Sequence, residues 1–197
     1  MGGRYPRVEN VGRKHPASGV QINLGEPTIV FLTVNTRDRR PWLAQPLVHE
    51  CLCEAWRQAQ AWLVGYYLLM PDHLHLFCAP RDLTVTLDDW VTYWKRQFKR
   101  TINGRVRLLP NPDQKVAGKS DPPQPGEVRV REDSHPPLIG NPADFRWQEG
   151  KPWDTRLRRA ENYQQKWQYV SENPVRKGLV ENPDDWPYQG MLNVLPW

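Results

Sequence analysis

The segment YYLLMPDHLHLFCAP, residues 66–80, contains two apolar runs that meet at a Pro-Asp pair. Both runs have the length and residue types of a buried strand, and two residues between them are enough for a hairpin turn. His73 and His75 interrupt the second run one residue apart. Side chains two positions apart on a strand share a face, so we expect the two imidazoles together, with Leu74 and Leu76 on the other face.

Strand and helix patterns surround this hairpin. The run TIVFLTVNT, residues 28–36, is rich in β-branched residues and predicts a strand, whereas residues 46–62 carry apolar side chains at helical spacing. A second helix is expected over residues 87–103, with Gly104 as its stop. The order strand, helix, strand, strand, helix is the first part of a ferredoxin-like unit, which needs one more strand.

The last third of the chain contains that strand and a further helix. KPWDTRL, residues 151–157, predicts the strand, and RAENYQQKWQYVSEN, residues 159–173, predicts a helix. We expect the helix to end before Pro174, because the residue that precedes a proline disfavours the α region. The fold class that follows is α+β: a ferredoxin-like antiparallel sheet with helices on one face, plus a C-terminal helix that carries Tyr169.

Composition separates one packed domain from loose segments. Between about residues 107 and 144, Pro, Gly and charged residues dominate, and such a segment buries too little apolar surface to offset the entropy of ordering. We expect a long, Pro-rich, flexible insertion there. The domain itself is expected over residues 25–190, between a flexible N-terminal extension (1–24) and a short tail (191–197).

Charge and aromatic content indicate nucleic acid as the partner. The 197 residues include 27 Lys and Arg against 22 Asp and Glu, a formal net charge of +5, together with ten Trp and seven Tyr. This mixture suits a polyanion whose bases stack, although a merely soluble basic protein can have the same composition. No apolar run reaches the roughly 18 residues of a membrane span, so we expect a cytoplasmic protein without membrane contact. No obligate protein partner is evident from the sequence.

Two polar side chains of the last helix lie away from its apolar stripe. Tyr163, Trp167 and Val170 share one face at helical spacing, whereas Tyr169 and Asn173 lie on another face, one turn apart. A phenol and an amide oxygen are therefore presented side by side. Taken alone, an exposed Tyr on a helix usually has no function, and a His pair on a strand is also compatible with two hydrogen-bonded structural side chains.

The combination of these motifs is more specific than its parts. The HLH strand, the segment YVSENPVRKGLV at 169–180 and the segment DDWPY at 184–188 resemble the HUH single-tyrosine transposases, most of all the REP-associated tyrosine transposases. The resemblance implies the HUH endonuclease fold. This sequence departs from the family in its Pro-rich insertion, its extended N-terminus and Thr155, where many relatives carry His.

The resemblance also implies a reaction. His73 and His75 correspond to the metal ligands of the family, with Mg²⁺ or Mn²⁺ as the cofactor, and Asn173 to the third ligand. Tyr169 corresponds to the nucleophile, which cuts single-stranded DNA next to a hairpin and forms a 5′-phosphotyrosine. A phenol with a pKa of about 10 is a poor nucleophile at neutral pH, so a divalent ion at the scissile phosphate is chemically reasonable.

Basic residues near these motifs are the candidates for phosphate binding. They follow the first strand, lie on one side of the second helix or follow Asn173, and a solvated surface is the alternative explanation for them. The candidate DNA-binding residues are Arg37, Arg39, Arg40, Lys95, Arg96, Lys99, Arg100, Arg176 and Lys177.

Two other functions are compatible with the sequence. A non-catalytic nucleic-acid-binding module on the same fold would use the histidines structurally. A water-using metal phosphodiesterase would keep the metal ligands and leave Tyr169 as a bystander. A covalent protein–DNA adduct distinguishes the three possibilities, because only a tyrosine nucleophile forms one.

Overall fold

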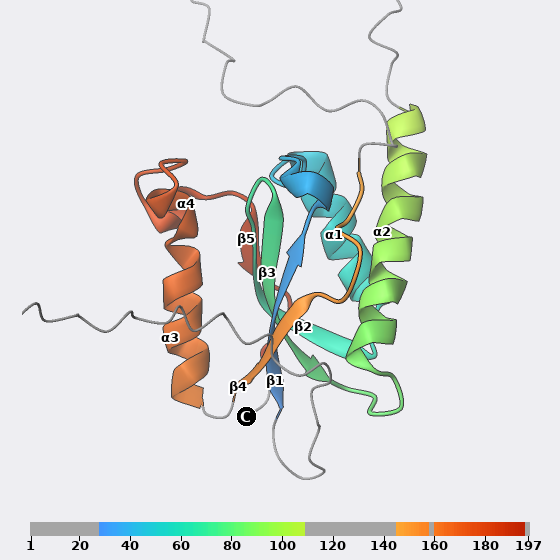
Figure 1. Cartoon of the computed structure of the whole chain (residues 1–197), viewed down its shortest axis with the longest axis horizontal. Coiled ribbons are helices and arrows are strands. Elements are labelled where there is room, and N and C mark those ends of the chain that lie inside the picture. Colours follow the sequence, from blue (N-terminus) through green and yellow to red (C-terminus); the bar gives the residue numbers. More distant parts are fainter. Residues whose placement is uncertain (1–27, 109–144, 158–159, 196–197) are drawn as a thin grey trace, which may run out of the picture.

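The computed structural model describes residues 28–108, 145–157 and 160–195 (Figure 1). The expected N-terminal extension and nearly all of the expected insertion lie outside these residues. The expected C-terminal tail begins inside a strand, and Leu195 is buried, so the packed part of the chain reaches residue 195.

Five antiparallel strands form one sheet with the order β4-β1-β3-β2-β5. The strands are β1 (Ile29–Asn35), β2 (Trp62–Leu69), β3 (His73–Pro80), β4 (Trp153–Leu157) and β5 (Gln189–Met191). Strands β1 to β4 confirm the four predicted strands, of which β4 was predicted because the ferredoxin-like unit needs one more strand. The fifth was not predicted, because three residues that include Gly190 carry no strand pattern of their own.

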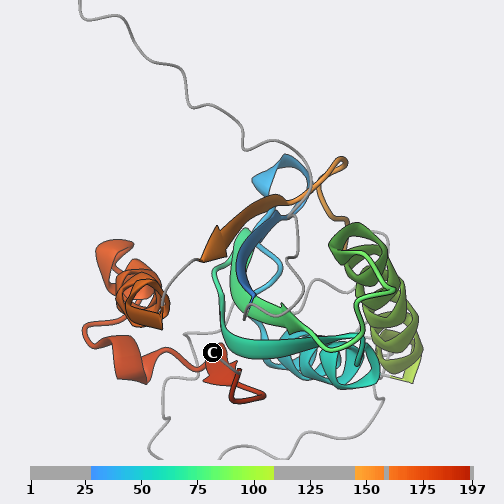
Figure 2. The same cartoon turned by 90° about the horizontal axis from the view of Figure 1, so that it is seen from below.

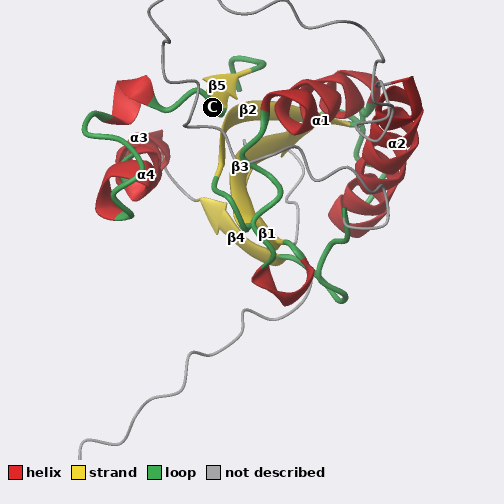
Figure 3. Ribbon diagram, turned by 90° about the horizontal axis from the view of Figure 1, so that it is seen from above, coloured by secondary structure: helices red, strands yellow, loops and turns green. Residues whose placement is uncertain are grey.

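Helices cover both faces of the sheet. The two long helices α1 (Pro46–Gln58) and α2 (Leu87–Leu108) pack on one face, and α3 (Ala160–Ser171) lies on the other, followed by the short α4 (Asn173–Arg176) (Figures 2 and 3). Two 3-10 turns, η1 (Arg37–Arg39) and η3 (Pro183–Asp185), complete the described elements. The α+β class and the separate C-terminal helix are as expected. None of the described helices is both long and apolar enough to cross a membrane.

The expectation that the second helix stops at Gly104 is wrong. Helix α2 continues to Leu108, because residues beyond the glycine have partners that keep them helical. Val106 packs against the core, and Arg105 forms ion pairs with Glu50 and Glu54 of α1 at 2.8 and 2.9 Å. The last helix ends two residues before the expected position, and Pro174 lies in the first turn of α4.

The core between the sheet and the two long helices is aromatic. Trp42 stacks on Phe98 with ring centroids 5.8 Å apart, and the edge of Trp147 meets both Trp42 and Trp94. Trp147 forms an isolated antiparallel bridge with Thr36, so the segment before β4 is fixed to the end of β1. Most of the Trp side chains in the described residues therefore serve packing.

The opposite face of the sheet fixes the rotation of α3. Tyr163 and Val170 are buried, and Trp167 lies flat on Tyr66 of β2 with ring centroids 4.5 Å apart and planes 7° from parallel. These three residues are the apolar stripe predicted for the helix. Because the stripe faces the sheet, Tyr169 points away from it and is 62% exposed.

Gly190 is expected to tolerate no side chain. A Cβ at this position would lie 2.7 Å from the hydroxyl oxygen of Tyr67 and 3.1 Å from its Cζ. Tyr67 has little room to move, because it is buried against Trp56 and hydrogen-bonded to His49. Gly190→Ala should lower the free energy of unfolding by about 1–3 kcal/mol, measured by urea denaturation.

Gly104→Ala is the matched control for this substitution. A Cβ at Gly104 would meet nothing within 4 Å, and the residue lies inside α2, where Ala is favoured over Gly by about 1 kcal/mol. This variant should therefore be more stable than the wild type. A loss of stability at Gly104 would contradict the continuous helix, and full stability of Gly190→Ala would contradict the packing of β5 on Tyr67.

Lys95 is expected to make stability depend on pH. Its Nζ lies 5.5 Å from the ring centroid of Trp147, and burial lowers its pKa from 10.5 to about 8. The pKa of Lys95 is lower in the folded than in the unfolded protein, so the charged amine lowers the free energy of unfolding. This penalty is complete below pH 8, decreases as the pH rises from 8 to 10.5, and is absent at higher pH.

Lys95→Met should therefore raise the melting temperature at pH 7, and its advantage over the wild type should shrink above pH 8. Thermal unfolding of both proteins across this pH range checks the expectation, and groups common to both cancel in the difference. A difference that stays constant with pH would show that the Lys95 amine is not desolvated in the folded protein.

Candidate functional site

The register of two central strands brings the histidine pair together with polar partners. In the antiparallel pairing of β1 with β3, Thr33 lies opposite His75 and Asn35 lies opposite His73. The two imidazole rings share one face of the sheet, with centroids 4.8 Å apart and planes at 85°. The shared face predicted from the sequence is thus confirmed.

Hydrogen bonds fix the orientation of both imidazoles. Nδ1 of His73 donates to Oδ1 of Asp72 at 2.7 Å, and Nδ1 of His75 lies 2.9 Å from the Thr33 hydroxyl oxygen. Among the described residues, neither Nε2 has a hydrogen-bond partner. When Nδ1 carries the proton, each Nε2 presents a lone pair, which is the arrangement found in metal-binding histidines.

The surroundings keep both rings neutral. Burial is the main cause that lowers the pKa of His75 to about 3, and the positive charges of Lys166 and Arg39 act in the same direction. Burial also lowers the pKa of His73, partly opposed by the carboxylate of Asp72. Neutral imidazole is the form that binds cations, so both side chains are in the ligand form at pH 7.

A network of polar residues holds the acidic partner of His73. The Arg39 guanidinium forms an ion pair with Asp72, with Nε 2.8 Å from Oδ2, and donates from Nη1 to Oδ1 of Asn35 at 2.5 Å. Asp38 and Arg39 have positive φ angles of 54° and 55°, a conformation that L-residues adopt only when other contacts hold it. Arg39, predicted as a DNA contact, is thus engaged in orienting the site.

Sequence reasoning did not single out Asp72, Thr33 or Asn35. The position of Asp72 directly before His73 was the available local signal, since a carboxylate next to a metal-binding histidine often fixes its tautomer. No local signal identifies Thr33 or Asn35, because they reach the histidines only through the register of β1 against β3.

Tyr169 lies in the last turn of α3 and Asn173 is the first residue of α4, at the same end of the sheet as the turn before β3 (Figure 1). Arg176 connects them: its guanidinium lies 4.2 Å from the ring centroid of Tyr169 and donates to the Tyr169 carbonyl. It also donates to Oδ1 of Asn173 at 2.6 Å. The amide oxygen of Asn173 is thus already hydrogen-bonded, with one lone pair left, and its role as a metal ligand stays a prediction.

The donor set suits a metal ion in part. His73 and His75 supply two nitrogen ligands with fixed orientation, which matches a divalent cation that keeps further positions for oxygen ligands. Across residues 28–108, 145–157 and 160–195, no group of three or more His, Cys, Asp or Glu side chains is clustered for metal binding. Any third protein ligand in this region would therefore be an amide, a hydroxyl or a carbonyl.

The predicted basic residues divide between two places. Those that follow β1 and α4 lie at the histidine end of the sheet: Arg37 pairs with Glu149 at 3.3 Å, and Arg40 and Lys177 are exposed. The α2 residues lie on the other face of the sheet from α3. The histidines lie on the α3 side, because His75 stacks on Phe31 and the Phe31 ring contacts Lys166 of α3. Arg96, Lys99 and Arg100 are exposed on α2, while Lys95 covers Trp147.

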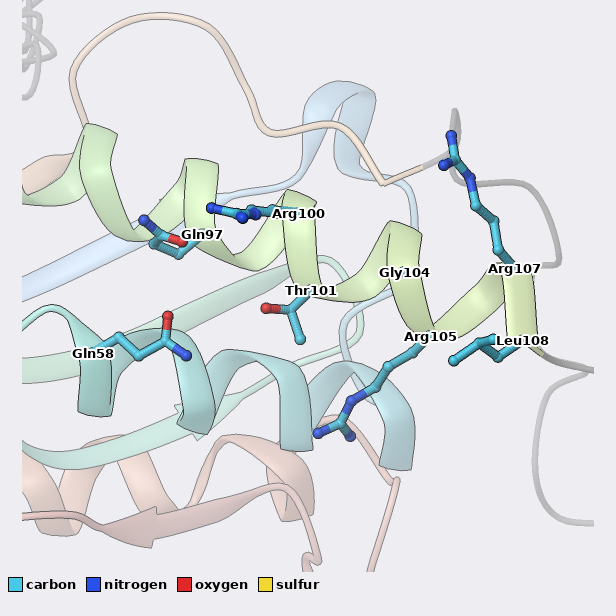
Figure 4. Close-up of a pocket in the computed structure, with 8 residues that line it drawn as sticks. All are labelled: Gln58, Gln97, Arg100, Thr101, Gly104, Arg105, Arg107 and Leu108. Atoms are coloured by element: carbon cyan, nitrogen blue, oxygen red, sulfur yellow. The ribbon is translucent and has the colours of Figure 1, made fainter.

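A hollow of about 550 Å³ beside α2 is separate from the histidine pair (Figure 4). Arg105 turns from this hollow toward α1, where Glu50 and Glu54 bind its guanidinium. The lining consists of Gln58, Gln97, Arg100, Thr101, Gly104, Arg105, Arg107 and Leu108. Its position on the α1–α2 side makes it no part of the histidine and tyrosine site.

Comparison with known proteins finds solved structures that are similar to this one. No protein-family model and no curated protein matches the chain. Among solved structures, a REP-associated tyrosine transposase bound to a REP hairpin is similar, with a TM-score of 0.51 and 19% identity over 87% of this chain and 81% of that one. A proposed transposase from Deinococcus radiodurans R1 is 18% identical, with a TM-score of 0.41 over 78% of this chain and 97% of that one. The chain therefore has the α+β fold of the REP-associated tyrosine transposase, as its motifs suggested.

Proposed function

We propose that this protein is a metal-dependent endonuclease and strand transferase for single-stranded DNA, acting next to hairpins through a 5′-phosphotyrosine. The observation that carries the proposal is the pair of neutral, oriented imidazoles on β3 at the end of the sheet where α3 presents an exposed tyrosine. The similar fold of a transposase that binds a REP hairpin supports a hairpin-bearing DNA as the substrate.

His73 and His75 hold the divalent ion in this proposal. Their Nε2 atoms are the metal-binding atoms. The Asp72 carboxylate holds the proton on Nδ1 of His73, and the Thr33 hydroxyl can accept a proton from Nδ1 of His75. When bound, Mg²⁺ or Mn²⁺ supplies positive charge that polarises a phosphate oxygen. Arg39 contributes indirectly, because it keeps the Asp72 carboxylate turned toward His73.

Tyr169 is the nucleophile in this proposal. Its phenol oxygen forms a bond to phosphorus while the bond from phosphorus to the 3′-oxygen breaks, and the phenol proton passes to solvent. The leaving 3′-oxygen takes up a proton and becomes a free hydroxyl. The phosphotyrosine keeps one phosphodiester linkage, so a second 3′-hydroxyl can reverse the step and join strands without ATP. The 62% exposure of Tyr169 leaves room for a DNA strand.

Tyr169→Phe should abolish both cleavage and the covalent adduct, because it removes only the attacking hydroxyl at an exposed position. Wild type and variant are incubated with Mn²⁺ and hairpin-bearing single-stranded DNA labelled at its 3′ end, which belongs to the fragment held by the phosphotyrosine. The samples are then denatured, and the label that travels with the protein is measured. Tyr93→Phe, at an exposed tyrosine of α2, is the matched control and should form adduct like the wild type.

The rival functions give different results in this assay. Cleavage by Tyr169→Phe at the wild-type rate would favour the phosphodiesterase that uses water. Absence of cleavage by the wild type on every substrate, with DNA binding retained, would favour the non-catalytic binding module.

Loss of either imidazole should abolish metal-dependent cleavage and leave DNA binding largely intact. His73→Ala and His75→Ala each remove one of the two nitrogen ligands, whereas Asp72→Asn leaves both ligands and disturbs only the orientation of His73. Asp72→Asn should weaken Mn²⁺ binding by about 10- to 100-fold, measured by titration calorimetry. Asn173→Ala should have a milder effect, because water can replace one amide ligand.

Asp184→Asn is the control for the carboxylate substitution, because Asp184 is exposed in η3 and should not alter Mn²⁺ affinity. Full cleavage activity of the wild type in excess chelator would remove the metal from the proposal. Unchanged Mn²⁺ affinity in both alanine variants would return the histidines to a structural role.

A further inference from the structure

Lys166 is a cation that the reaction described above leaves without a role. It lies in α3, three residues before Tyr169, and it is half-buried. Its Nζ lies 4.8 Å from the ring centroid of Phe31, 5.8 Å from that of Tyr169 and 6.0 Å from that of Trp153. The ammonium is thus surrounded by three aromatic rings that come from three different elements.

These rings locate the ammonium between the histidine pair and the tyrosine. Phe31 stacks on His75 with ring centroids 5.3 Å apart, so the ring nearest to Nζ is also in contact with a proposed metal ligand. On its other side, Nζ approaches the ring of Tyr169. The positive charge of Lys166 is also one of the causes that lower the pKa of His75.

The described residues supply no counter-charge for Lys166. No described carboxylate lies within ion-pair distance of its Nζ, whereas the Lys151 ammonium pairs with Asp88 at 2.6 Å and Arg39 pairs with Asp72. Aromatic faces attract an ammonium more weakly than an anion does, and a phosphate oxygen is a strong acceptor for it. The charge is therefore available to an anionic group placed between β3 and α3.

We propose that Lys166 is a further catalytic residue, whose ammonium binds a non-bridging oxygen of the scissile phosphodiester beside Tyr169. This inference rests on the proposed function. As the bond from Tyr169 to phosphorus forms and the bond to the 3′-oxygen breaks, negative charge grows on the non-bridging oxygens, and a fixed cation there stabilises the transition state. Lys166 remains protonated and transfers no proton.

The first test compares three variants in single-turnover cleavage at saturating hairpin DNA. Lys166→Gln should cleave at least about 100-fold more slowly, with a much smaller change in the dissociation constant for DNA, because the contact strengthens in the transition state. Lys166→Arg should recover part of the rate, since it restores the charge. Lys151→Gln makes the same change in net charge away from the site and should cleave like the wild type.

A purely structural role for Lys166 predicts another pattern. Lys166→Gln would then lose thermal stability in proportion to its loss of rate, and Lys166→Arg would not recover activity. Equal cleavage rates for the wild type and Lys166→Gln would overturn the proposal and leave the tyrosine mechanism untouched.

The second test needs no cleavage. In the Tyr169→Phe background, binding is measured by fluorescence anisotropy for oligonucleotides that each carry one neutral methylphosphonate at a different linkage. At one linkage, the neutral group should weaken the binding of DNA to Tyr169→Phe. The same group should have little effect on the double variant Tyr169→Phe, Lys166→Gln, because that variant already lacks the lysine that contacts the phosphate charge. Equal weakening in both backgrounds at every linkage would overturn the phosphate contact.

Failure of the wild type to cut any substrate would refute the proposed function, and the binding measurements would still decide whether Lys166 contacts a phosphate.

Discussion

The register of β1 against β3 is the constraint on which the site depends. Side chains alternate across a sheet, so a slip of one residue would turn Phe31, Thr33 and Asn35 away from the histidine face. The register is fixed where the strands meet the turn before His73: the backbone N–H and the hydroxyl of Thr36 both donate to the Asp72 carbonyl, at 3.0 and 2.9 Å. Thr36 is fully buried, and these bonds satisfy its polar groups. The same contacts that set the register therefore also hold the residue that orients His73.

Burial and positive charge act together on the two imidazoles. Desolvation disfavours the imidazolium form, and the cations of Arg39, Lys166 and Lys177 disfavour it further. A site built to carry protons at neutral pH would need the opposite arrangement, with carboxylates facing both rings. Here Asp72 faces only His73 and is itself paired with Arg39. The surroundings thus favour neutral imidazoles beside groups that attract an anion, which suits a cation and a phosphate in the same site.

Local periodicity predicted the elements that pack through their own side chains. The shared face of His73 and His75 follows from strand geometry, and the direction of Tyr169 follows from the apolar stripe of its helix. The same reasoning failed for Gly104, where residues beyond a helix-breaking signal are held by ion pairs with another helix. It also missed β5, whose pairing with β2 depends on the close approach of Gly190 to Tyr67. Thr33, Asn35 and Lys166 could not be found locally, because their relation to the histidines exists only after strands and helix have assembled.

The path between the two groups of basic residues follows from the packing of Trp147. Helix α2 lies on the opposite face of the sheet from α3, and the histidines lie on the α3 side. A DNA strand that contacts both must therefore pass around the end of the sheet. The Lys95 ammonium lies over the ring of Trp147, and Trp147 forms a β-bridge with Thr36. Thr36 lies directly before η1 and hydrogen-bonds to the carbonyl of Asp72, in the turn before β3. Arg37 and Arg40 lie in and just after η1, beyond this bridge, and Arg176 lies at the same end of the molecule beside Tyr169. In the proposed function, the phosphates of a bound DNA would therefore contact basic residues along a path that runs from α4, over the end of the sheet, to α2. In this proposal Tyr169 lies at one end of that path, so contacts on α2 would position the flanking DNA and leave the chemistry to β3 and α3.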